Sequence, residues 1–197
     1  DADQAHLAGE EAVAVGVGSM AALMGLSLDA TNDVCKQASA PGEPVETANL
    51  NGGGQIVISG HVAAIDRAIP LAKAAGAKRA VKLSVSAPFH CSMMAPAAEQ
   101  LAQALQSVPV AAPSVPVVTN VEALPNQDAS RVKQLLIQQV TGAVRWEESI
   151  AWMAGQGVTR AFELGSGAVL KGLVKRIAET INVTTIGEPH EVDAFTA

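Results

Sequence analysis

The sequence predicts an α/β protein in which a small α+β unit precedes part of a parallel sheet. Between residues 18 and 86, segments of strand and helix character follow the order β-α-β-β-α-β, which is typical of a ferredoxin-like unit. From residue 97 onward, strands alternate with helices, which favours a parallel sheet covered on both faces. The composition agrees with this class, because 49% of the residues are hydrophobic but only 3% are aromatic, so the core must consist mainly of aliphatic side chains.

The elements of the small unit each have their own signal. Strands are predicted from buried apolar or β-branched runs bounded by glycine, and helices from apolar residues at helical spacing. Ser27 is placed to cap the first helix, and Pro70 is expected to kink the second. The predicted strands are 18–26, 45–50, 55–60 and 79–86, and the predicted helices are 27–38 and 61–78.

The remainder of the chain is predicted in the same way, with Asp128 placed to cap a helix. The predicted helices are 97–108, 129–140, 146–154 and 167–180, and the predicted strands are 115–121, 160–165 and 183–187. The chain is therefore expected to contain an N-terminal segment and linker (1–17), a small subdomain (18–83) and part of a larger α/β layer (84–197).

Charge and composition argue against several classes of function. The net charge is -6 and the pI is near 5.2, so we do not expect nucleic-acid binding. The longest uncharged run, residues 100–121, contains three prolines, and no membrane span is expected. Two cysteines without paired spacing indicate reduced thiols and a cytoplasmic protein. The chain opens with Asp1 in a polar stretch without a signal peptide, and its start resembles a cut or processed end.

His90 is the first candidate for chemistry. It follows the strand predicted at 79–86 and a Pro-Phe turn, and ligands bind beyond the carboxyl ends of strands in parallel α/β folds. An imidazole there can act as a general base, although a loop histidine bonded to the backbone is the alternative. We do not expect Cys91 to be its nucleophile, because adjacent side chains in a turn diverge. No serine has glycine at both positions of a Gly-x-Ser-x-Gly elbow, so any nucleophile that His90 serves lies outside these residues.

Other motifs are weaker. The four histidines are far apart and no His-x-x-His or Cys-x-x-Cys pair occurs, so no metal site is predicted. Gly165 and Gly167 lie between a predicted strand and a helix, where helix amides can cradle a phosphate, but a structural turn is the preferred interpretation. Lys171, Lys175 and Arg176 share one face of that helix, either as a solvated face or as a landing site for an acidic partner.

Several segments together resemble malonyl-CoA:acyl carrier protein transacylases. These include "NLNGGGQIVISGH", "AAGAKRAVKLSVSAPFHCSMMAPAAEQL", "VRWEESIAWMAGQGV" and "FELGSGAVLKGLVKRI", in the order and spacing of that family, and the similarity runs from about Glu11 to Pro189. The resemblance implies an α/β-hydrolase-like acyltransferase core, incomplete here, with the ferredoxin-like subdomain inserted. It also implies ping-pong transfer of a malonyl group from malonyl-CoA through a serine ester to the phosphopantetheine thiol of acyl carrier protein, in fatty acid biosynthesis and without a cofactor.

The resemblance assigns roles to individual residues. His90 matches the catalytic histidine, and Gln139 matches the residue whose backbone carbonyl orients that imidazole. Phe89 matches a ring that disfavours the 2-methyl branch of methylmalonyl groups, an effect worth about 1–3 kcal/mol. Asn51 and Asn49 match the loop that lines the substrate cleft.

The sequence also departs from the family pattern. The glutamine of the oxyanion hole, the nucleophilic serine and the carboxylate-binding arginine have no counterparts here, and the first arginine is Arg67. Residues 1–10 do not match the family. Three hypotheses therefore stay open: the C-terminal part of a transacylase, a non-catalytic fragment that binds acyl carrier protein, and a polyketide-synthase acyltransferase domain.

Overall fold

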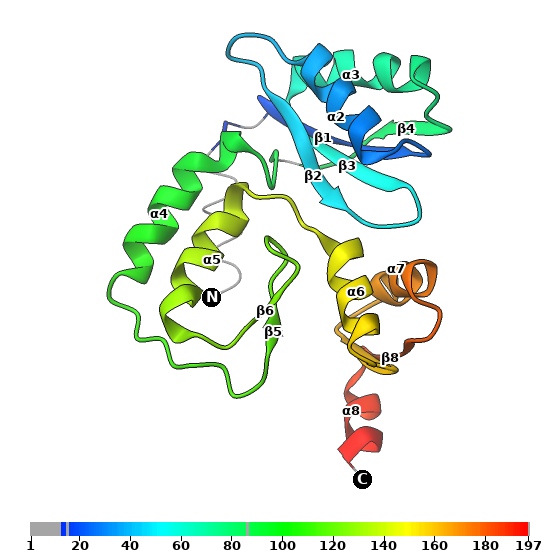
Figure 1. The fold of residues 1–197 in the computed structure, drawn as a ribbon. Helices are drawn as coiled ribbons and strands as arrows, with labels where there is room; N and C mark the ends of the chain where they lie inside the picture. Colours follow the sequence, from blue (N-terminus) through cyan, green and yellow to red (C-terminus); the bar gives the residue numbers. More distant parts are fainter. Residues whose placement is uncertain (1–12, 15, 86, 197) are drawn as a thin grey trace. The chain divides into compact units, whose positions relative to one another are not determined.

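The computed structural model describes residues 13, 14, 16–85 and 87–196, which form two compact units divided between Trp146 and Glu147 (Figure 1). Helices and strands are mixed in both, as in an α/β protein. No helix of the described part is long and apolar enough to cross a membrane.

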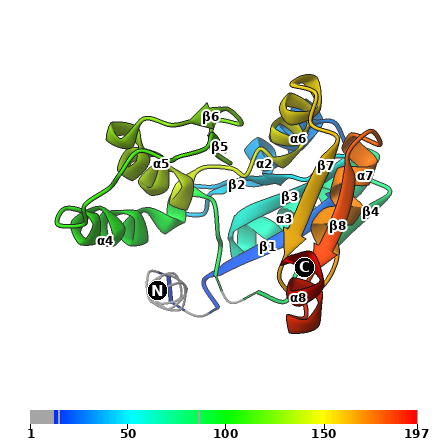
Figure 2. The same ribbon diagram turned by 90° about the horizontal axis from the view of Figure 1, so that it is seen from below.

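The first unit begins with a four-stranded sheet in which the strands lie in the order β2-β3-β1-β4 and each neighbouring pair is antiparallel. Two helices connect its strands and pack on one face (Figure 2). The bounds are β1 (Gly18–Met24), α2 (Leu28–Ala38), β2 (Val45–Leu50), β3 (Gln55–His61), α3 (Val62–Ala74) and β4 (Arg79–Lys82). These six elements follow the order that the sequence predicts.

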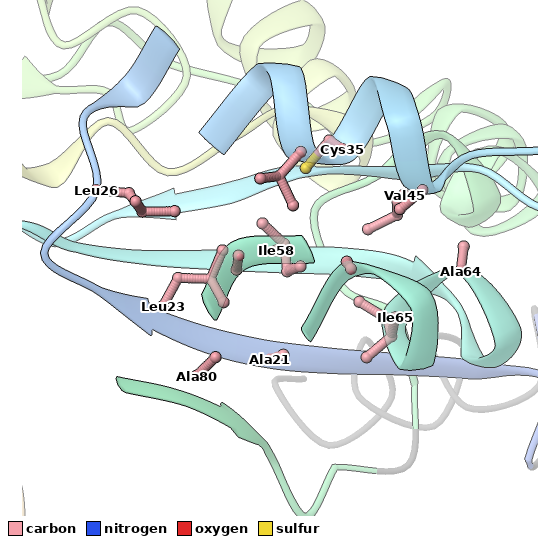
Figure 3. Packing of buried hydrophobic residues seen from close by; sticks show 13 residues of the cluster. Ala21, Leu23, Leu26, Cys35, Val45, Ile58, Ala64, Ile65 and Ala80 are labelled. Atoms are coloured by element: carbon pink, nitrogen blue, oxygen red, sulfur yellow. The ribbon is translucent and has the colours of Figure 1, made fainter. Parts of the chain in front are cut away.

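The main core of this unit lies between the sheet and its two helices. Alternation along the strands turns Leu23 and Ile58 towards α2 and α3, where Ile65 packs with them, and all three are fully buried (Figure 3). The intervening residues point to the opposite face, where Met20, Ala48 and Val57 form a second buried cluster. The sheet therefore offers an apolar surface on the face away from its helices.

The predicted start of the first helix is confirmed, but the ends of several predicted elements differ in the structure. Ser27 caps α2 as predicted, with its Oγ accepting from the amide of Ala30 at 3.2 Å. Helix α3 ends at Ala74 rather than residue 78, with Pro70 inside it, because the chain turns at Gly76 with φ of +100°. Strand β4 ends at Lys82 rather than residue 86, since the strand pairing with β1 stops there.

Beyond β4, two helices pack side by side in both views (Figures 1 and 2). The 3₁₀ turn η1 (Ser92–Met94) leads into α4 (Ala95–Leu105), and α5 (Ala129–Thr141) follows later. Asp128 caps α5 as predicted, because its Oδ1 accepts from the amide of Ser130 at 2.8 Å.

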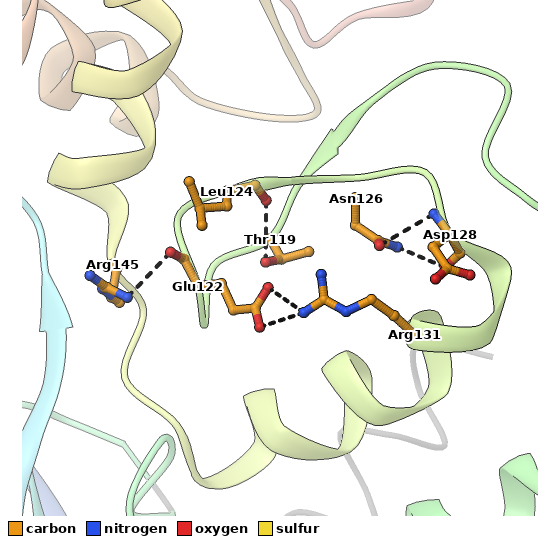
Figure 4. Close-up of polar contacts among 7 residues, drawn as sticks. All are labelled: Thr119, Glu122, Leu124, Asn126, Asp128, Arg131 and Arg145. Carbon is orange, nitrogen blue, oxygen red and sulfur yellow. Dashed lines mark hydrogen bonds and ion pairs between the residues drawn. The ribbon is translucent and has the colours of Figure 1, made fainter.

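The predicted strand 115–121 is wrong in length and in partner. Only β5 (Val117–Val118) is formed, and it pairs antiparallel with β6 (Pro125–Asn126). The chain reverses because the amide of Thr119 bonds to the carbonyl of Leu124 at 3.0 Å and Ala123 adopts a φ of +58°. Glu122 in this turn accepts from Arg131 at 2.7 and 2.9 Å, and its carbonyl accepts from Arg145 at 3.2 Å (Figure 4).

The second unit contains the parallel pairing expected from the sequence. Strand β7 (Arg160–Leu164) lies parallel to β8 (Asn182–Ile186), and they are the one parallel strand pair among the described residues. The helices are α6 (Trp146–Gly155), which starts at the division between the units, α7 (Val169–Ile177) and α8 (Pro189–Thr196). Helix α8 was not predicted.

Replacing Ile58 by alanine is expected to destabilise the protein by about 2–5 kcal/mol, because this fully buried side chain would leave a cavity in the main core. Val81→Ala on the edge strand β4 is the control, since Val81 is 39% exposed and its removal leaves no enclosed cavity. Urea unfolding measures both, and equal losses for the two variants would contradict this description of the core.

Candidate active site

The turn that carries His90 is fixed to β1 from one side. Pro88 is fully buried and lies so close to Gly18 that an added Cβ at Gly18 would be 2.3 Å from the proline Cδ. Cys91 is also fully buried and donates its thiol hydrogen to the carbonyl of Pro88 at 3.1 Å. Cys91 is therefore oriented into the turn as a structural residue.

His90 has an uncommon backbone conformation. Its φ of 60° lies in the left-handed region, which only a few per cent of non-glycine residues occupy. Such conformations cost free energy and recur at functional sites, where surrounding contacts maintain them. The imidazole is half-buried rather than enclosed in the core.

The ring of His90 contacts the end of helix α5. Its Nδ1 lies 3.1 Å from the backbone oxygen of Gln139. The last four carbonyls of a helix lack intrahelical donors, and the neighbouring carbonyl of Gln138 is already bonded to the amide of Gly142 at 2.8 Å. A carbonyl can only accept, so this contact assigns the proton to Nδ1 and leaves the lone pair on Nε2.

The side chain of Gln139 also contacts this nitrogen, but its amide nitrogen can only donate and makes no hydrogen bond with a protonated Nδ1, so the assignment rests on the backbone carbonyl. Its Nε2 lies 3.2 Å from Nδ1 of His90 and donates to the carbonyl of Gly142 at 3.0 Å. The bond to Gly142 fixes the amide orientation, because the opposite orientation would set Oε1 against that carbonyl. Oε1 is buried and has no hydrogen-bond partner among the described residues.

Phe89 packs against two groups of side chains. It packs against the cluster of Met20, Ala48 and Val57 on the open face of the sheet. It also packs against a second cluster that contains Met94 of η1 and Ala97 of α4, where Val140 of α5 packs as well. Its ring thus lies between the sheet and helices α4 and α5, directly beside His90 in the chain.

The two asparagines lie on or just beyond β2. Asn49 pairs with Val144, which follows α5, in an isolated parallel bridge, and Asn51 begins the turn to β3 with its amide bonded to the carbonyl of Gln55 at 3.0 Å. Both are half-buried. The structure thus brings His90 and Gln139 into direct contact and connects the strand of Asn49 to the segment after Gln139.

A cavity of about 280 Å³ opens between the β5–β6 hairpin and α5. Its walls are mainly apolar and include Val118, Leu135 and Leu136, and Gln139 lines one side. His90 is not among its lining residues. The cavity therefore approaches the residue that holds the imidazole but does not contain the base itself.

The strand-to-helix turn of the second unit is structural. The carboxylate of Glu163 accepts from the amides of Leu170 and Lys171, each at 2.8 Å, and so occupies the helix N-terminus where a phosphate would bind. Lys171, Lys175 and Arg176 are exposed along α7. They are not part of the first unit, which carries His90.

Two residues near His90 were missed by sequence reasoning. The carboxylate of Glu46 on β2 accepts from the amide and the hydroxyl of Ser92, two residues after His90. Alternation along β2 indicates which face Glu46 occupies, but no sequence pattern predicts its partner.

Among the described residues, no group of three or more His, Cys, Asp or Glu is placed to hold a metal ion.

Comparison with known proteins points to one group of enzymes. The malonyl CoA-acyl carrier protein transacylase of Salmonella typhimurium is 43% identical over 94% of this chain, and that of Bacillus subtilis is 41% identical over 93%. The chain spans 60% and 58% of those proteins, respectively. No family model matches the chain.

Solved structures give the same result. An acyl-carrier-protein S-malonyltransferase from Bartonella henselae superposes with a TM-score of 0.90 and 48% identity, covering 97% of this chain and 60% of its own. A malonyl-transacylase in complex with a type II PKS acyl-carrier protein gives a TM-score of 0.91 and 38% identity, covering 98% and 62%. The chain is thus similar over nearly all its length to about 60% of these enzymes.

Both cysteines are expected to resist alkylation in the native protein. Burial is the main cause that raises the pKa of Cys35 to about 12 and also raises the pKa of Cys91. Iodoacetamide should react slowly with the native protein at pH 8 and rapidly in urea, because only the thiolate is nucleophilic. Rapid native labelling of Cys91 would contradict its structural role.

The same burial predicts a pH dependence of stability. The Cys35 thiol of the unfolded chain ionises near its ordinary pKa of 9.0, whereas the folded one ionises near 12, so the unfolded state loses its proton first. The free energy of unfolding should therefore fall as the pH rises from about 9 towards 12. Urea midpoints across that range measure the slope, and Cys35→Ala, as the control, should reduce it.

Proposed function

We propose that this chain, which is similar over 94% of its length to malonyl CoA-acyl carrier protein transacylases, supplies the general base of a malonyl transfer from malonyl-CoA to acyl carrier protein. The observation that carries the proposal is the contact between His90 Nδ1 and the Gln139 carbonyl at 3.1 Å. It leaves Nε2 unprotonated on a half-buried ring, as a base near neutral pH requires.

The proposed reaction has two half-reactions. Nε2 of His90 takes the proton of a serine hydroxyl while the serine oxygen attacks the thioester carbonyl carbon of malonyl-CoA. The carbon–sulfur bond then breaks, and the proton passes from the imidazolium to the departing CoA sulfur. In the second half, His90 takes a proton from the phosphopantetheine thiol while the thiol sulfur attacks the ester carbonyl carbon of malonyl-serine. The carbon–oxygen bond to the serine then breaks, and the imidazolium returns the proton to the serine oxygen. The serine is contributed by sequence outside this chain.

Phe89, Asn49 and Asn51 complete the proposed acyl site. Phe89 is held between two apolar clusters next to the base, so its ring has little freedom to move aside for a branched acyl group. Asn49 and Asn51 present polar side chains from β2 and the turn after it. We assign these three residues to recognition of the malonyl group.

The proposal extends to the domains and the partner. The β-α-β-β-α-β order and the antiparallel β2-β3-β1-β4 sheet support a ferredoxin-like subdomain over 18–83, with 84–197 belonging to an α/β-hydrolase-like core. We assign Lys171, Lys175 and Arg176 of α7 to binding of acyl carrier protein, through their positive charge. Cytoplasmic location and the absence of a cofactor follow from the same assignment.

A second candidate has one observation in its favour. The malonyl-transacylase at a TM-score of 0.91 was solved with a PKS acyl-carrier protein, so the carrier of this chain can belong to polyketide rather than fatty acid synthesis. A third reading, a carrier-binding fragment without chemistry, predicts a polypeptide that never acquires a malonyl group. Intact mass after incubation with malonyl-CoA separates this reading from the first two.

His90→Ala, in the polypeptide that includes the nucleophile, should reduce acyl transfer by roughly 10³-fold or more, because the serine loses its base. The rate of malonyl-serine formation, followed by intact mass, is the measurement. His190→Ala is the matched control, since His190 is exposed on α8 and has no proposed part in the reaction. Turnover of His90→Ala close to the unmodified rate would remove His90 from this role.

Phe89→Ser should raise the use of methylmalonyl-CoA relative to malonyl-CoA by about 10-fold, because a smaller side chain leaves room for the methyl branch. The ratio of kcat/KM for the two substrates measures the effect. Phe162→Ser is the control, as Phe162 is 40% exposed on β7 in the second unit. An unchanged ratio in Phe89→Ser would exclude Phe89 from acyl selection.

A further inference from the structure

Strand β2 contacts the chain on both sides of the His90–Gln139 pair. On one side, Glu46 of β2 binds Ser92, two residues after His90. On the other, β2 pairs with Val144, which follows the helix that carries Gln139. These two segments are far apart in the sequence, and β2 is the element that both of them contact.

The contact with Ser92 uses both carboxylate oxygens of Glu46. Oε2 accepts from the backbone amide of Ser92 at 3.0 Å, and Oε1 accepts from its hydroxyl at 2.5 Å. Ser92 opens the 3₁₀ turn η1, so the carboxylate serves as the cap that this turn does not obtain from Cys91. Hydrogen bonds to an ionised acceptor are about twice as strong as neutral ones.

The alternation along β2 explains why Glu46 can reach this turn. Val45 points into the main core, and the hydroxyl of Thr47 bonds to Asn32 of α2 at 2.8 Å, so both lie on the helix-covered face. Glu46 and Ala48 lie on the opposite face, where Phe89 packs against the buried cluster to which Ala48 belongs. The glutamate is therefore directed to the face on which the His90 turn lies.

The second contact depends on an irregularity in the same strand. The register between β2 and β3 shifts between Thr47 and Asn49, so Ala48 has no Cα partner on β3. Its carbonyl accepts from the amide of Val144 at 2.8 Å, and the carbonyl of Val144 accepts from the amide of Leu50 at 2.8 Å. Val144 is thereby bonded to the outer edge of the sheet, which fixes the end of α5.

We propose that Glu46 is a positioning residue for His90, and that β2 aligns the imidazole with the Gln139 carbonyl by binding Ser92 and Val144 at the same time. The inference rests on the proposed function for its catalytic consequence. The alignment of the His90 ring by Glu46 does not depend on catalysis and can be measured without an activity assay. His90 has a φ of 60°, so without the Ser92 anchor the turn can relax and move the ring away from its acceptor.

The first experiment measures the ring directly in the 197-residue chain. Ring ¹⁵N chemical shifts report which nitrogen of His90 carries the proton, and the spectrum of His90→Gln identifies its signals among the four histidines. We expect the Nδ1–H form in the unmodified chain. In Glu46→Ala we expect a shift towards the tautomer mixture of an unrestrained histidine, with partial recovery in Glu46→Gln, whose amide oxygen can still accept one bond from Ser92.

Glu43→Gln is the matched control. It removes a carboxylate next to β2 whose ion-pair partner is Arg67, at 2.7 Å, and not Ser92. Glu43→Gln should keep the Nδ1–H form. Adding Ser92→Ala to Glu46→Ala should change the spectrum no further, because the Ser92 hydroxyl has already lost its acceptor on Glu46. If Glu46→Ala does not fold, as judged by circular dichroism, Glu46→Gln carries the test.

The second experiment measures transfer in the polypeptide that includes the nucleophile. Glu46→Ala should lower kcat by roughly 10-fold or more with little change in the KM for malonyl-CoA, since a misplaced base slows the chemistry rather than the binding. An unchanged His90 tautomer in Glu46→Ala and Glu46→Gln would overturn the proposal. A shifted tautomer together with no malonyl transfer in the unmodified protein would support the positioning role and refute the proposed function instead.

Discussion

The site depends on one hydrogen bond between a side chain and the end of a helix. At the C-terminus of helix α5, backbone carbonyls lack intrahelical donors. The Nδ1 atom of His90 lies 3.1 Å from one of them, the carbonyl oxygen of Gln139. Because the acceptor is part of the backbone, its position is set by everything that fixes the end of α5. Two contacts fix this helix end. The carbonyl of Gly142 accepts a hydrogen bond from the side-chain amide of Gln139, and Val144 is hydrogen-bonded to β2 at the edge of the sheet. The chemistry of one imidazole thus depends on the packing of two layers.

Local signals in the sequence predict the elements well where the partners are also local. Ser27 and Asp128 cap their helices as predicted, since capping depends on residues only two or three positions away. The valine-rich segment 115–121 shows the limit of such signals. Its β-branched residues fit a sheet surface, but propensity does not say which strand will pair with it, and the turn at Ala123 gave it an antiparallel neighbour.

The site shows a sharper limit. His90 could be selected as a candidate from its place after a strand, but its partner is a backbone oxygen, for which every residue type is equivalent. Gln139 was therefore available only through resemblance to known enzymes. The bond between Glu46 and Ser92 had no signal of either kind, because the two residues are separated by two strands and a helix of the same unit. Tertiary contacts of this type become visible only once the sheet is formed.

The neutral acceptor on Nδ1 has a consequence for the proposed chemistry. A buried carboxylate in its place would orient the ring equally well but would also stabilise the imidazolium strongly. In a two-step transfer the base must accept a proton, return it to a leaving sulfur, and then repeat the cycle with a thiol. A carbonyl fixes the tautomer without holding the proton on the ring, and it adds no negative charge next to a malonate anion. The backbone of α5 therefore orients the imidazole, while the negative charge in the proposed site comes from the substrate alone.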